Sequence, residues 1–384
     1  MTGYSGAFFK RKRVICMCGY SSTDDEKYMR HAIELAKKGV GWTNPNPMVG
    51  AVIVKDGKII GEGYHKKYGE LHAETSALNN CTKSPEGATI YVTLEPCCHH
   101  GKQPPCTEAI IKAGIKRVVI GSLDPNPLVS GKGIQILREH NIQVDNKLVC
   151  NRECIDMNYV FFHYIKEKLP YVIVKYAQTL DGKIATHNGL SKWITGEAAR
   201  ENVHMDRHRY SAIMVGINTV LKDDPMLNCR SKAIENPHQP VRIVCDTKLR
   251  IPYDSKLVKT AGQIPVWIVT CCNDKERISM YENAGCEIIA MEGEKIDIAQ
   301  LMIILGRRGI DSCICEGGAE LNWSVIKSGM VKRIQAYIAP KIFGGVDAPA
   351  SVAGVGFDAP DDALKLKDYT VTRLGDDILI EGEV

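Results

Sequence analysis

MVGAVIVKDGKIIGEGY, residues 48–64, reads as two short strands joined by the tight turn Asp56-Gly57. Asp-Gly suits this turn because both of its central positions need positive φ angles. Downstream we expect a helix from about His72, a strand over 88–94, a helix over 106–113 and a strand over 117–121. This alternation predicts an α/β layered sheet, with functional residues where strands end and helices begin.

The folded chain is predicted to start at Thr23. Thr23 and Glu26 have the spacing of a capping box, and apolar residues then recur at helical intervals up to Gly39, a candidate C-cap. Residues 1–22 are interpreted as a disordered extension without a function. They carry a basic cluster at positions 10–13, but the apolar segment behind it is shorter than the core of a signal peptide.

A second α/β domain is predicted after the aromatic stretch 159–164. Strands are expected over residues 171–176, 212–215, 241–245, 266–270 and 312–315, with helical segments between several of them. The chain of 384 residues is also too long for one ordinary domain. We therefore expect two domains, over residues 23–168 and 169–384.

Composition excludes several classes of protein. With 44% hydrophobic and 24% charged residues, the chain is not expected to be disordered. The formal net charge is only +4, and acidic side chains slightly outnumber basic ones from Leu169 onward, which argues against nucleic-acid binding. No stretch approaches the ~18 apolar residues of a membrane span. The 15 cysteines are an odd number without an export signal, so we expect reduced thiols in a cytoplasmic protein.

The clearest chemistry lies in His72-Ala73-Glu74 and in the pair Cys97 and Cys106. One imidazole and two thiolates leave a fourth position for water, which is typical of a catalytic zinc site. Zinc lowers the pKa of such water, and Glu74 could carry protons between it and a departing amine. Residues two apart do not share a helix face, so His72 and Glu74 can converge only at a helix N-terminus. Cys97 and Cys106 are each expected to precede a short helix, whose dipole would favour the thiolate.

Two other interpretations of these residues stay open. His99 or His100 could complete a closed structural zinc site, but this would leave Glu74 without a role. Cys98 is interpreted as a packed thiol, with competition for the metal as the alternative.

The pattern resembles the zinc cytidine-deaminase superfamily, whose signature is H-x-E followed by P-C-x-x-C. Here eight residues separate the two cysteines, which is similar to the deaminase domain of the bifunctional RibD family of riboflavin biosynthesis. TNPNPMVG (43–50), GEGYH (61–65) and TLEPC (93–97) continue the resemblance. It implies a cytidine-deaminase-like three-layer α/β/α fold. It also implies that Asn46 and His65 bind the pyrimidine or ribose, and that His99, Lys102 and Gln103 hold the ribose 5-phosphate.

The second domain has no Gly-x-Gly-x-x-Gly after a strand, so a Rossmann site is not predicted. Gly317 and Gly318 follow a predicted strand, either as a phosphate-binding helix start or simply as a turn. KYAQTLDGKIA (175–185), SKWITG (191–196), GINTVLKDDPML (216–227) and IAPKIFGG (338–345) resemble the RibD reductase domain. The resemblance spans about residues 170–380 and implies a dihydrofolate-reductase-like α/β fold that reduces a ribosyl group with NADPH.

The same resemblance implies two sets of contacts in this domain. The expected cofactor contacts are Ala177, Trp193, Thr195, Thr219, Asp223, Thr247, Gly318, Ala319, Glu320, Leu321, Asn322, Trp323 and Ser324. The expected substrate contacts are Ser191, Arg207, Leu227, Arg230 and Glu316. The two arginines offer fork-shaped donors to a phosphate, and Glu316 can accept hydrogen bonds from sugar hydroxyls. Core packing remains the alternative for Trp193, and a turn or cap remains the alternative for Asp223.

Together these features predict a bifunctional enzyme with one Zn²⁺ per chain and NADPH. It would deaminate a diaminopyrimidine ribosyl phosphate and then reduce the ribosyl side chain, with Lys175 or Asp223 as the proton donor of the reduction. We expect small phosphoribosyl pyrimidines as its ligands, a homo-oligomeric state, and neither nucleic acid nor membrane as a partner. The alternatives are a nucleic-acid-editing protein, which should be more basic, and an inactive structural zinc protein.

Overall fold

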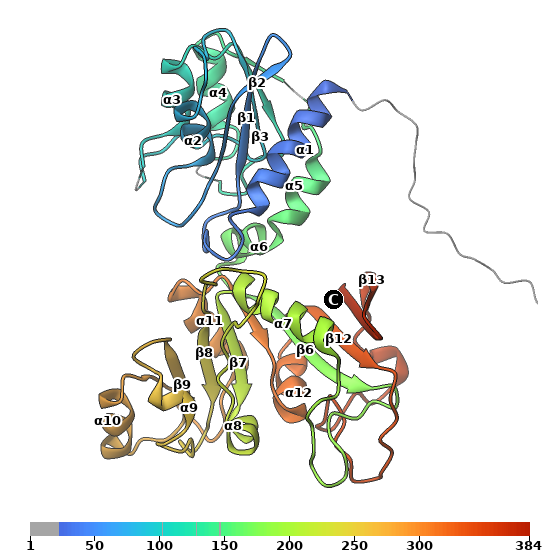
Figure 1. The fold of residues 1–384 in the computed structure, drawn as a ribbon. Coiled ribbons are helices and arrows are strands. Elements are labelled where there is room, and N and C mark those ends of the chain that lie inside the picture. Colours follow the sequence, from blue (N-terminus) through green and yellow to red (C-terminus); the bar gives the residue numbers. More distant parts are fainter. Residues whose placement is uncertain (1–22, 102, 128, 146) are drawn as a thin grey trace, which may run out of the picture.

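The computed structural model describes residues 23–101, 103–127, 129–145 and 147–384. These residues form two α/β bodies, one with a five-stranded and one with a nine-stranded sheet, which lie one above the other in Figure 1. The predicted extension, residues 1–22, lies outside the described residues.

The first sheet has the strand order β2-β1-β3-β4-β5. Its strands are β1 (Gly50–Lys55), β2 (Lys58–Tyr64), β3 (Thr89–Val92), β4 (Arg117–Ile120) and β5 (Gln143–Val144). β1 pairs antiparallel with β2 and β3, whereas β3, β4 and β5 run parallel. The turn between β1 and β2 has φ angles of 50° at Asp56 and 71° at Gly57, which confirms the predicted hairpin.

Helices cover both faces of this sheet, on opposite sides of the strands in Figure 1. They are α1 (Asp24–Lys37), α2 (Ala73–Asn79), α3 (Cys106–Lys112), α4 (Lys132–Glu139), α5 (Asn151–Met157) and α6 (Tyr159–Glu167). α1 and α5 pack around Val52 and Tyr91, while α2, α3 and α4 pack around Ile53 and Ile90. Successive strand residues point to opposite faces, so the apolar run of β1 fills both core layers. The three-layer α/β/α arrangement is the predicted one.

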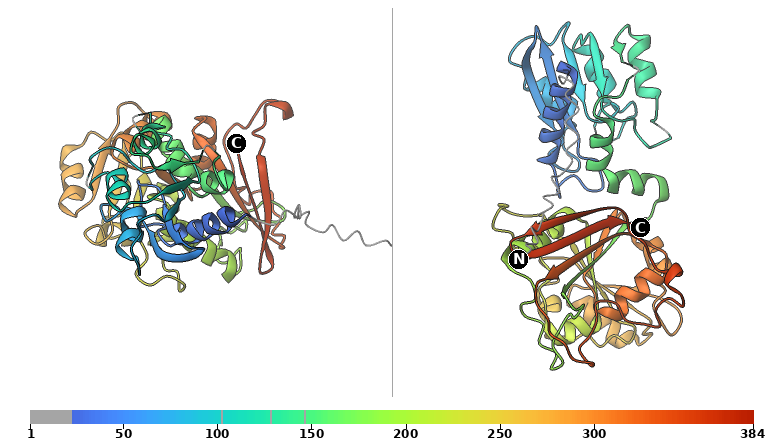
Figure 2. Two further views of the ribbon diagram at one scale, coloured as in Figure 1. Left: turned by 90° about the horizontal axis from the view of Figure 1, so that it is seen from above. Right: turned by 90° about the vertical axis from the view of Figure 1, so that its right-hand side faces the viewer.

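The second sheet has the order β10-β9-β8-β7-β11-β6-β12-β14-β13. Its strands are β6 (Tyr171–Thr179), β7 (Ala212–Gly216), β8 (Val241–Cys245), β9 (Val266–Thr270), β10 (Glu287–Ala290), β11 (Ser312–Cys315), β12 (Val331–Ala339), β13 (Lys367–Leu374) and β14 (Asp377–Glu383). Neighbours from β10 to β12 run parallel, and β14 and β13 continue the sheet antiparallel. Figure 2 shows these two last strands at one side of the lower body.

The second sheet is also covered on both faces. Its helices are α7 (Glu197–Arg209), α8 (Ile217–Asp223), α9 (Lys256–Lys259), α10 (Lys275–Asn283), α11 (Ile298–Arg307), α12 (Ala319–Lys327) and the 3-10 turn η1 (Pro360–Asp362). One core layer joins α8, α9 and α10 to the sheet, and another joins α11 and α12. All five strands predicted from the sequence are present, and β6 runs on to Thr179.

The two bodies touch through α6 and the loop before β1. The Tyr159 and Tyr210 hydroxyls are 2.7 Å apart, and the Tyr164 hydroxyl donates to the Gly306 carbonyl at 2.9 Å. In the described part of the chain, no helix has the length and apolar character needed to cross a bilayer.

Candidate active sites

A cavity of about 310 Å³ opens at the carboxyl ends of β3 and β4 in the first body. It is lined by most of the residues predicted for a deaminase site: Asn46, His65, His72, Glu74, Cys97, His99 and Gln103. Cys106 lies buried directly beside it. Lys102, the remaining predicted residue, lies outside the described residues.

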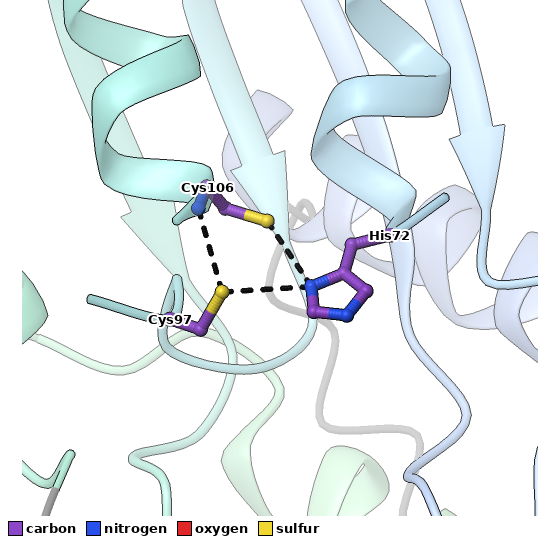
Figure 3. A group of neighbouring side chains, drawn as sticks. All are labelled: His72, Cys97 and Cys106. Atoms are coloured by element: carbon purple, nitrogen blue, oxygen red, sulfur yellow. Dashed lines mark hydrogen bonds between the residues drawn. The ribbon is translucent and has the colours of Figure 1, made fainter. Parts of the chain in front are cut away.

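His72, Cys97 and Cys106 bring three ligand atoms together (Figure 3). His72 Nδ1 is 3.5 Å from Cys97 Sγ and 3.3 Å from Cys106 Sγ. Tetrahedral zinc bound to nitrogen and sulfur places its ligand atoms roughly 3.5 Å apart. The three side chains therefore fit one Zn²⁺ ion. Among the described residues, neither His99 nor His100 joins this group, and His100 lies beside Glu108 instead.

The local sequence explains why these side chains converge. His72 is the N-cap of α2, so its ring projects beyond the helix end while Glu74 sits in the first turn, as the spacing predicted. Cys106 begins α3, and Pro105 is its N-cap, where the missing backbone N–H breaks no helical hydrogen bond. The expectation of a short helix directly after Cys97 is wrong, because Cys97 lies in a loop and the next helix among the described residues begins at Cys106. The helix dipole still reaches it, since the Cys106 backbone N–H at the start of α3 donates to Cys97 Sγ at 3.4 Å.

The electrostatics of the cavity suit proton transfer. Burial, together with the nearby Cys97 charge, raises the pKa of Glu74 to about 7. At neutral pH this carboxyl can therefore both accept and release a proton. A hydrogen bond from Cys106 lowers the pKa of the Cys97 thiol, although burial opposes the shift. Burial raises the pKa of Cys98, which stands outside the ligand group.

His65 sets the direction of the Asn46 amide. His65 Nδ1 lies 3.1 Å from the Leu71 carbonyl oxygen, which can only accept, so Nδ1 carries the proton. Burial lowers the pKa of His65, which leaves Nε2 as a neutral acceptor 3.3 Å from Asn46 Nδ2. The Asn46 NH₂ group thus faces His65, and its carbonyl oxygen points elsewhere and can accept a hydrogen bond.

The cavity also contains polar residues that the sequence did not single out. Glu95, Asp124 and Asn126 belong to its lining. Glu95 is buried and accepts backbone N–H groups of Asp124 at 3.4 Å and Gly131 at 3.0 Å, so it holds the loop after β4 against the site. The sequence could have indicated these residues by their position alone. They follow two adjacent parallel strands, and polar residues in such places lie at one edge of the sheet.

The second set of predicted residues gathers at the carboxyl ends of the parallel strands in the lower body. Ala177 lies on β6, Thr219 and Asp223 on α8 after β7, Thr247 after β8, and Gly318 to Ser324 at the start of α12 after β11. β7 and β11 are neighbours, and a Cβ on Gly318 would lie 3.7 Å from Thr219 Oγ1. From β7 the chain continues to β8 on one side of this pair, and from β11 it continues to β12 on the other side. Open α/β sheets bind their ligands at such a change of direction.

An ion cluster forms beside this edge. Glu316, directly after β11, accepts Arg207 Nε at 2.8 Å and Nη2 at 2.9 Å, and Lys175 Nζ lies 3.5 Å away. All three side chains are nearly buried. Burial alone would raise the pKa of Glu316, but the charges of Arg207 and Lys175 outweigh it and lower the pKa to about 2. Glu316 is therefore a carboxylate at neutral pH.

The other predicted residues occupy distinct positions. Ser191, Trp193 and Thr195 precede α7. Trp193 is 64% exposed with Arg200 stacked 4.5 Å from its ring centre, so it is not a core residue. Asp223 ends α8, and Asp224 is the cap residue of that helix.

The remaining predicted residues of the second site differ in how deeply their side chains are buried. Leu227 points into the core, which leaves its backbone for any ligand contact. Arg230 is exposed and hydrogen-bonds Asn228. Asn322 is buried and donates to the Ser351 carbonyl at 2.9 Å, and Trp323 packs against Phe357.

Comparisons with known proteins match both bodies. Residues 22–122 match the family described as cytidine and deoxycytidylate deaminase zinc-binding region, and residues 170–380 match the RibD C-terminal domain. The riboflavin biosynthesis protein RibD of Actinobacillus pleuropneumoniae is 50% identical over 364 residues, covering 94% of this chain and 96% of that one. The chain belongs to the RibD family.

Solved RibD structures share the whole fold. The RibD structure from Acinetobacter baumannii superposes with a TM-score of 0.84 at 36% identity, covering 94% of this chain and 99% of that one. A deaminase/reductase from Thermotoga maritima gives the same TM-score at 38% identity and covers 94% and 98%. This RibD chain is therefore a bifunctional enzyme of riboflavin biosynthesis, a hydrolase and an oxidoreductase that acts on small pyrimidine substrates. Its cofactors are Zn²⁺ for the deaminase and NADPH for the reductase.

Proposed function

We propose that the first site deaminates 2,5-diamino-6-(ribosylamino)-4(3H)-pyrimidinone 5′-phosphate and that the second reduces the ribosyl group of 5-amino-6-(5-phosphoribosylamino)uracil to ribityl. The printed name of the Thermotoga maritima relative describes these two activities for that protein. The observation that carries the proposal is the cavity in which Glu74 lies beside three zinc-ligand side chains.

His72, Cys97 and Cys106 would hold the metal. Bound there, Zn²⁺ supplies the Lewis acidity that makes water nucleophilic near neutral pH. Glu74 takes a proton on a carboxylate oxygen and delivers it to the nitrogen of the amino group that departs as ammonia. Its pKa of about 7 allows both transfers at neutral pH. Oxygen from water replaces the amino group, so no other reactant is required.

Asn46 and His65 would orient the pyrimidine. The Asn46 carbonyl oxygen accepts a ring N–H, because its NH₂ group is turned toward His65. His99, Gln103 and Lys102 would hold the ribose 5-phosphate at the cavity mouth, where His99 is exposed and Gln103 Nε2 donates to the Gly69 carbonyl at 3.1 Å. Histidine and amide N–H groups suit a phosphate, which offers only acceptors at neutral pH.

In the second site NADPH would supply the hydride to C1′ of the ring-opened imine form of the ribosylamine. The residues at the strand ends, from Ala177 and Thr219 to the α12 start at Gly318, would bind the cofactor together with Trp193, Thr195, Asp223 and Thr247. Gly318 suits this role because backbone N–H groups at a helix start can approach phosphate oxygens. Ser191 and the backbone of Leu227 would border the sugar.

Glu316 would accept hydrogen bonds from the sugar hydroxyls. Because Nε and Nη2 of Arg207 are taken by Glu316, Arg207 acts on the substrate mainly through this carboxylate. The exposed Arg230 then provides the guanidinium for the phosphate. Of the two candidate proton donors we favour Lys175, which lies beside Glu316 in the nearly buried cluster, whereas Asp223 is exposed at the end of α8.

Other features of the protein belong to the same proposal. The domains would divide between Lys168 and Leu169, where α6 ends and the second sheet is about to begin. The protein would act in the cytoplasm, where its many thiols stay reduced, and as a homo-oligomer. Neither nucleic acid nor membrane would be a partner, which the near-neutral charge of the chain supports.

Mass analysis of the reaction products tests the proposal. Zinc-loaded protein incubated with the diaminopyrimidine phosphate alone should exchange one amino group for oxygen. Addition of NADPH should then add two hydrogens to the ribosyl group. A protein that oxidises NADPH with the diaminopyrimidine but never releases ammonia would contradict the proposed assignment of the first site.

A further inference from the structure

The loop between α1 and β1 carries Asn46 into the deaminase cavity and is held from the other domain. The Asn44 side-chain NH₂ lies 3.2 Å from Asp311 Oδ1, 3.2 Å from Ser211 Oγ and 3.3 Å from the Arg209 carbonyl oxygen. These three acceptors all belong to the second body. Asn44 is thus two residues from a cavity residue and bonded to the opposite domain.

Asp311 is built as a fixed acceptor. It is buried, and Oδ1 also accepts the Ser211 hydroxyl at 2.7 Å and the Ser312 hydroxyl at 2.6 Å. Both hydroxyls donate to the same oxygen that Asn44 contacts, which favours this orientation of the Asp311 carboxyl group. The Asn44 amide thus meets a buried oxygen that two hydroxyls already hold in place, so the contact restrains the loop.

Shape reinforces this anchor. Gly41 has a φ of +75°, and a Cβ there would lie 2.3 Å from the His208 carbonyl oxygen of α7. The loop backbone therefore packs on the reductase helix at a distance that only glycine permits. The Trp42 ring then stands edge-on to His208 and His238, with ring centres 6.0 and 5.9 Å apart.

The loop is also pinned on its other side. The buried Asn158, between α5 and α6, accepts the Met48 N–H at 2.8 Å and donates to the Met48 carbonyl at 2.9 Å. Asn46 lies between the anchors at Asn44 and Met48, and its N–H donates to the Thr43 carbonyl at 2.8 Å. With the backbone fixed on both sides, Asn46 Nδ2 stays within reach of His65.

We infer that Asp311 and Asn44 are positioning residues for the deaminase, so that the reductase domain holds the loop carrying a substrate contact of the other active site. This inference rests on the proposed role of Asn46 as a pyrimidine contact. Asp311 directly precedes β11, the strand that leads into Glu316, so one strand of the second sheet serves both sites from its two ends.

Substitutions in the full-length, zinc-loaded protein test the inference. Asn44→Ala and Asp311→Ala should each raise the deaminase KM by about tenfold and leave kcat within about twofold, because a contact made equally in ground and transition states is weakened. Zinc content and the reductase kcat/KM should not change. Asp311→Asn keeps an oxygen for Asn44 and should keep the wild-type KM. The double variant Asn44→Ala, Asp311→Ala should be no worse than either single variant.

Asn151→Ala is the matched control. Asn151 is a partly buried asparagine of the same domain whose amide donates to one carbonyl, that of Gly121, at 3.0 Å. The Asn151→Ala variant should keep the wild-type kcat and KM in both reactions. A wild-type deaminase KM in Asn44→Ala and Asp311→Ala would overturn the inference, and so would an equal fall of kcat in both reactions.

A readout without substrate separates this inference from the proposed function. Backbone amides of residues 42–48 should exchange hydrogen faster in Asp311→Ala than in the wild type, and unchanged exchange would overturn the inference. Absence of ammonia release by the wild-type protein would instead refute the proposed function. The two failures are therefore distinguishable.

Discussion

Arg207 and Glu316 form a two-pronged ion pair, with Nε to Oε1 at 2.8 Å and Nη2 to Oε2 at 2.9 Å. Arg207 comes from the last turn of α7 and Glu316 from the end of β11, so the pair ties a helix to the sheet edge where the reductase residues gather. The fold therefore supplies a carboxylate that is both buried and ionised, a state that an isolated glutamate in the same place would not keep.

Removing one partner of this pair should damage the reductase alone. Arg207→Ala leaves Glu316 buried with only Lys175 as a counter-charge, so we expect a loss of about 3 to 5 kcal/mol in unfolding free energy and loss of NADPH oxidation. Ammonia release should continue at a temperature where the variant is folded. The double variant Arg207→Met, Glu316→Gln leaves no unpaired carboxylate and should recover part of the stability in urea unfolding but not the reductase activity. Recovery of the activity as well would show that the pair is only structural.

Neighbouring cysteines should differ sharply in zinc binding. Cys97→Ser should reduce bound zinc well below one ion per chain and abolish ammonia release, because one of three protein ligands is lost. Cys98→Ser changes the adjacent thiol, which stands outside the ligand group, and should keep full zinc content. Metal analysis of the two purified variants measures this difference in zinc content. Equal zinc loss in both would place Cys98 in the metal site.

The turn before α12 offers a test of cofactor binding. A methyl group on Gly318 would meet Thr219 Oγ1 at an ordinary contact distance of 3.7 Å, so Gly318→Ala should fold normally. It should nevertheless raise the KM for NADPH at least about tenfold, because the side chain would occupy space that the phosphates need. Gly262→Ala, where a methyl group meets nothing within 4 Å, is the control. Steady-state kinetics with varied NADPH would contradict the assignment if the two variants had the same KM.

Asp206 should make the stability of the protein fall as pH rises. Burial raises the pKa of this carboxyl to about 7. Between its ordinary pKa of 3.8 and 7 the folded state keeps a proton that the unfolded state has lost, so unfolding is favoured by increasing pH. Wild-type protein should lose roughly 2 to 3 kcal/mol more than Asp206→Asn between pH 5 and pH 8. If the unfolding free energies of the two proteins, measured in urea, changed in parallel with pH, the raised pKa of Asp206 would be refuted.

Short-range features could be predicted from the sequence. The Asp56-Gly57 turn and the placement of His72 and Glu74 at a helix start follow from local backbone rules. The mistaken helix after Cys97 was also a local matter, because Pro104 and Pro105 each disfavour helical backbone at the preceding residue, so a helix that began after Cys97 would have to end within a few residues.

Long-range contacts were beyond those rules. Nothing in one sequence indicates that Arg207 takes Glu316 as its partner, or that Asn44 bonds to Asp311. Glu95 likewise looked like part of a motif, and its role in holding the loop at Gly131 depends on how β3 and β4 lie side by side. Such pairings are decided by the register and packing of whole sheets rather than by neighbouring residues.

The division of labour between the two sites is tested most directly with Glu74→Gln and both substrates. Given the diaminopyrimidine phosphate, the variant should keep its zinc, release ammonia at least about a hundredfold more slowly than the wild type, and oxidise NADPH only at that slow rate. Given the aminouracil phosphate, it should oxidise NADPH at the wild-type rate. Ammonia release from the diaminopyrimidine at the wild-type rate would contradict the assignment of Glu74, and slow NADPH oxidation with the aminouracil would contradict the independence of the two sites.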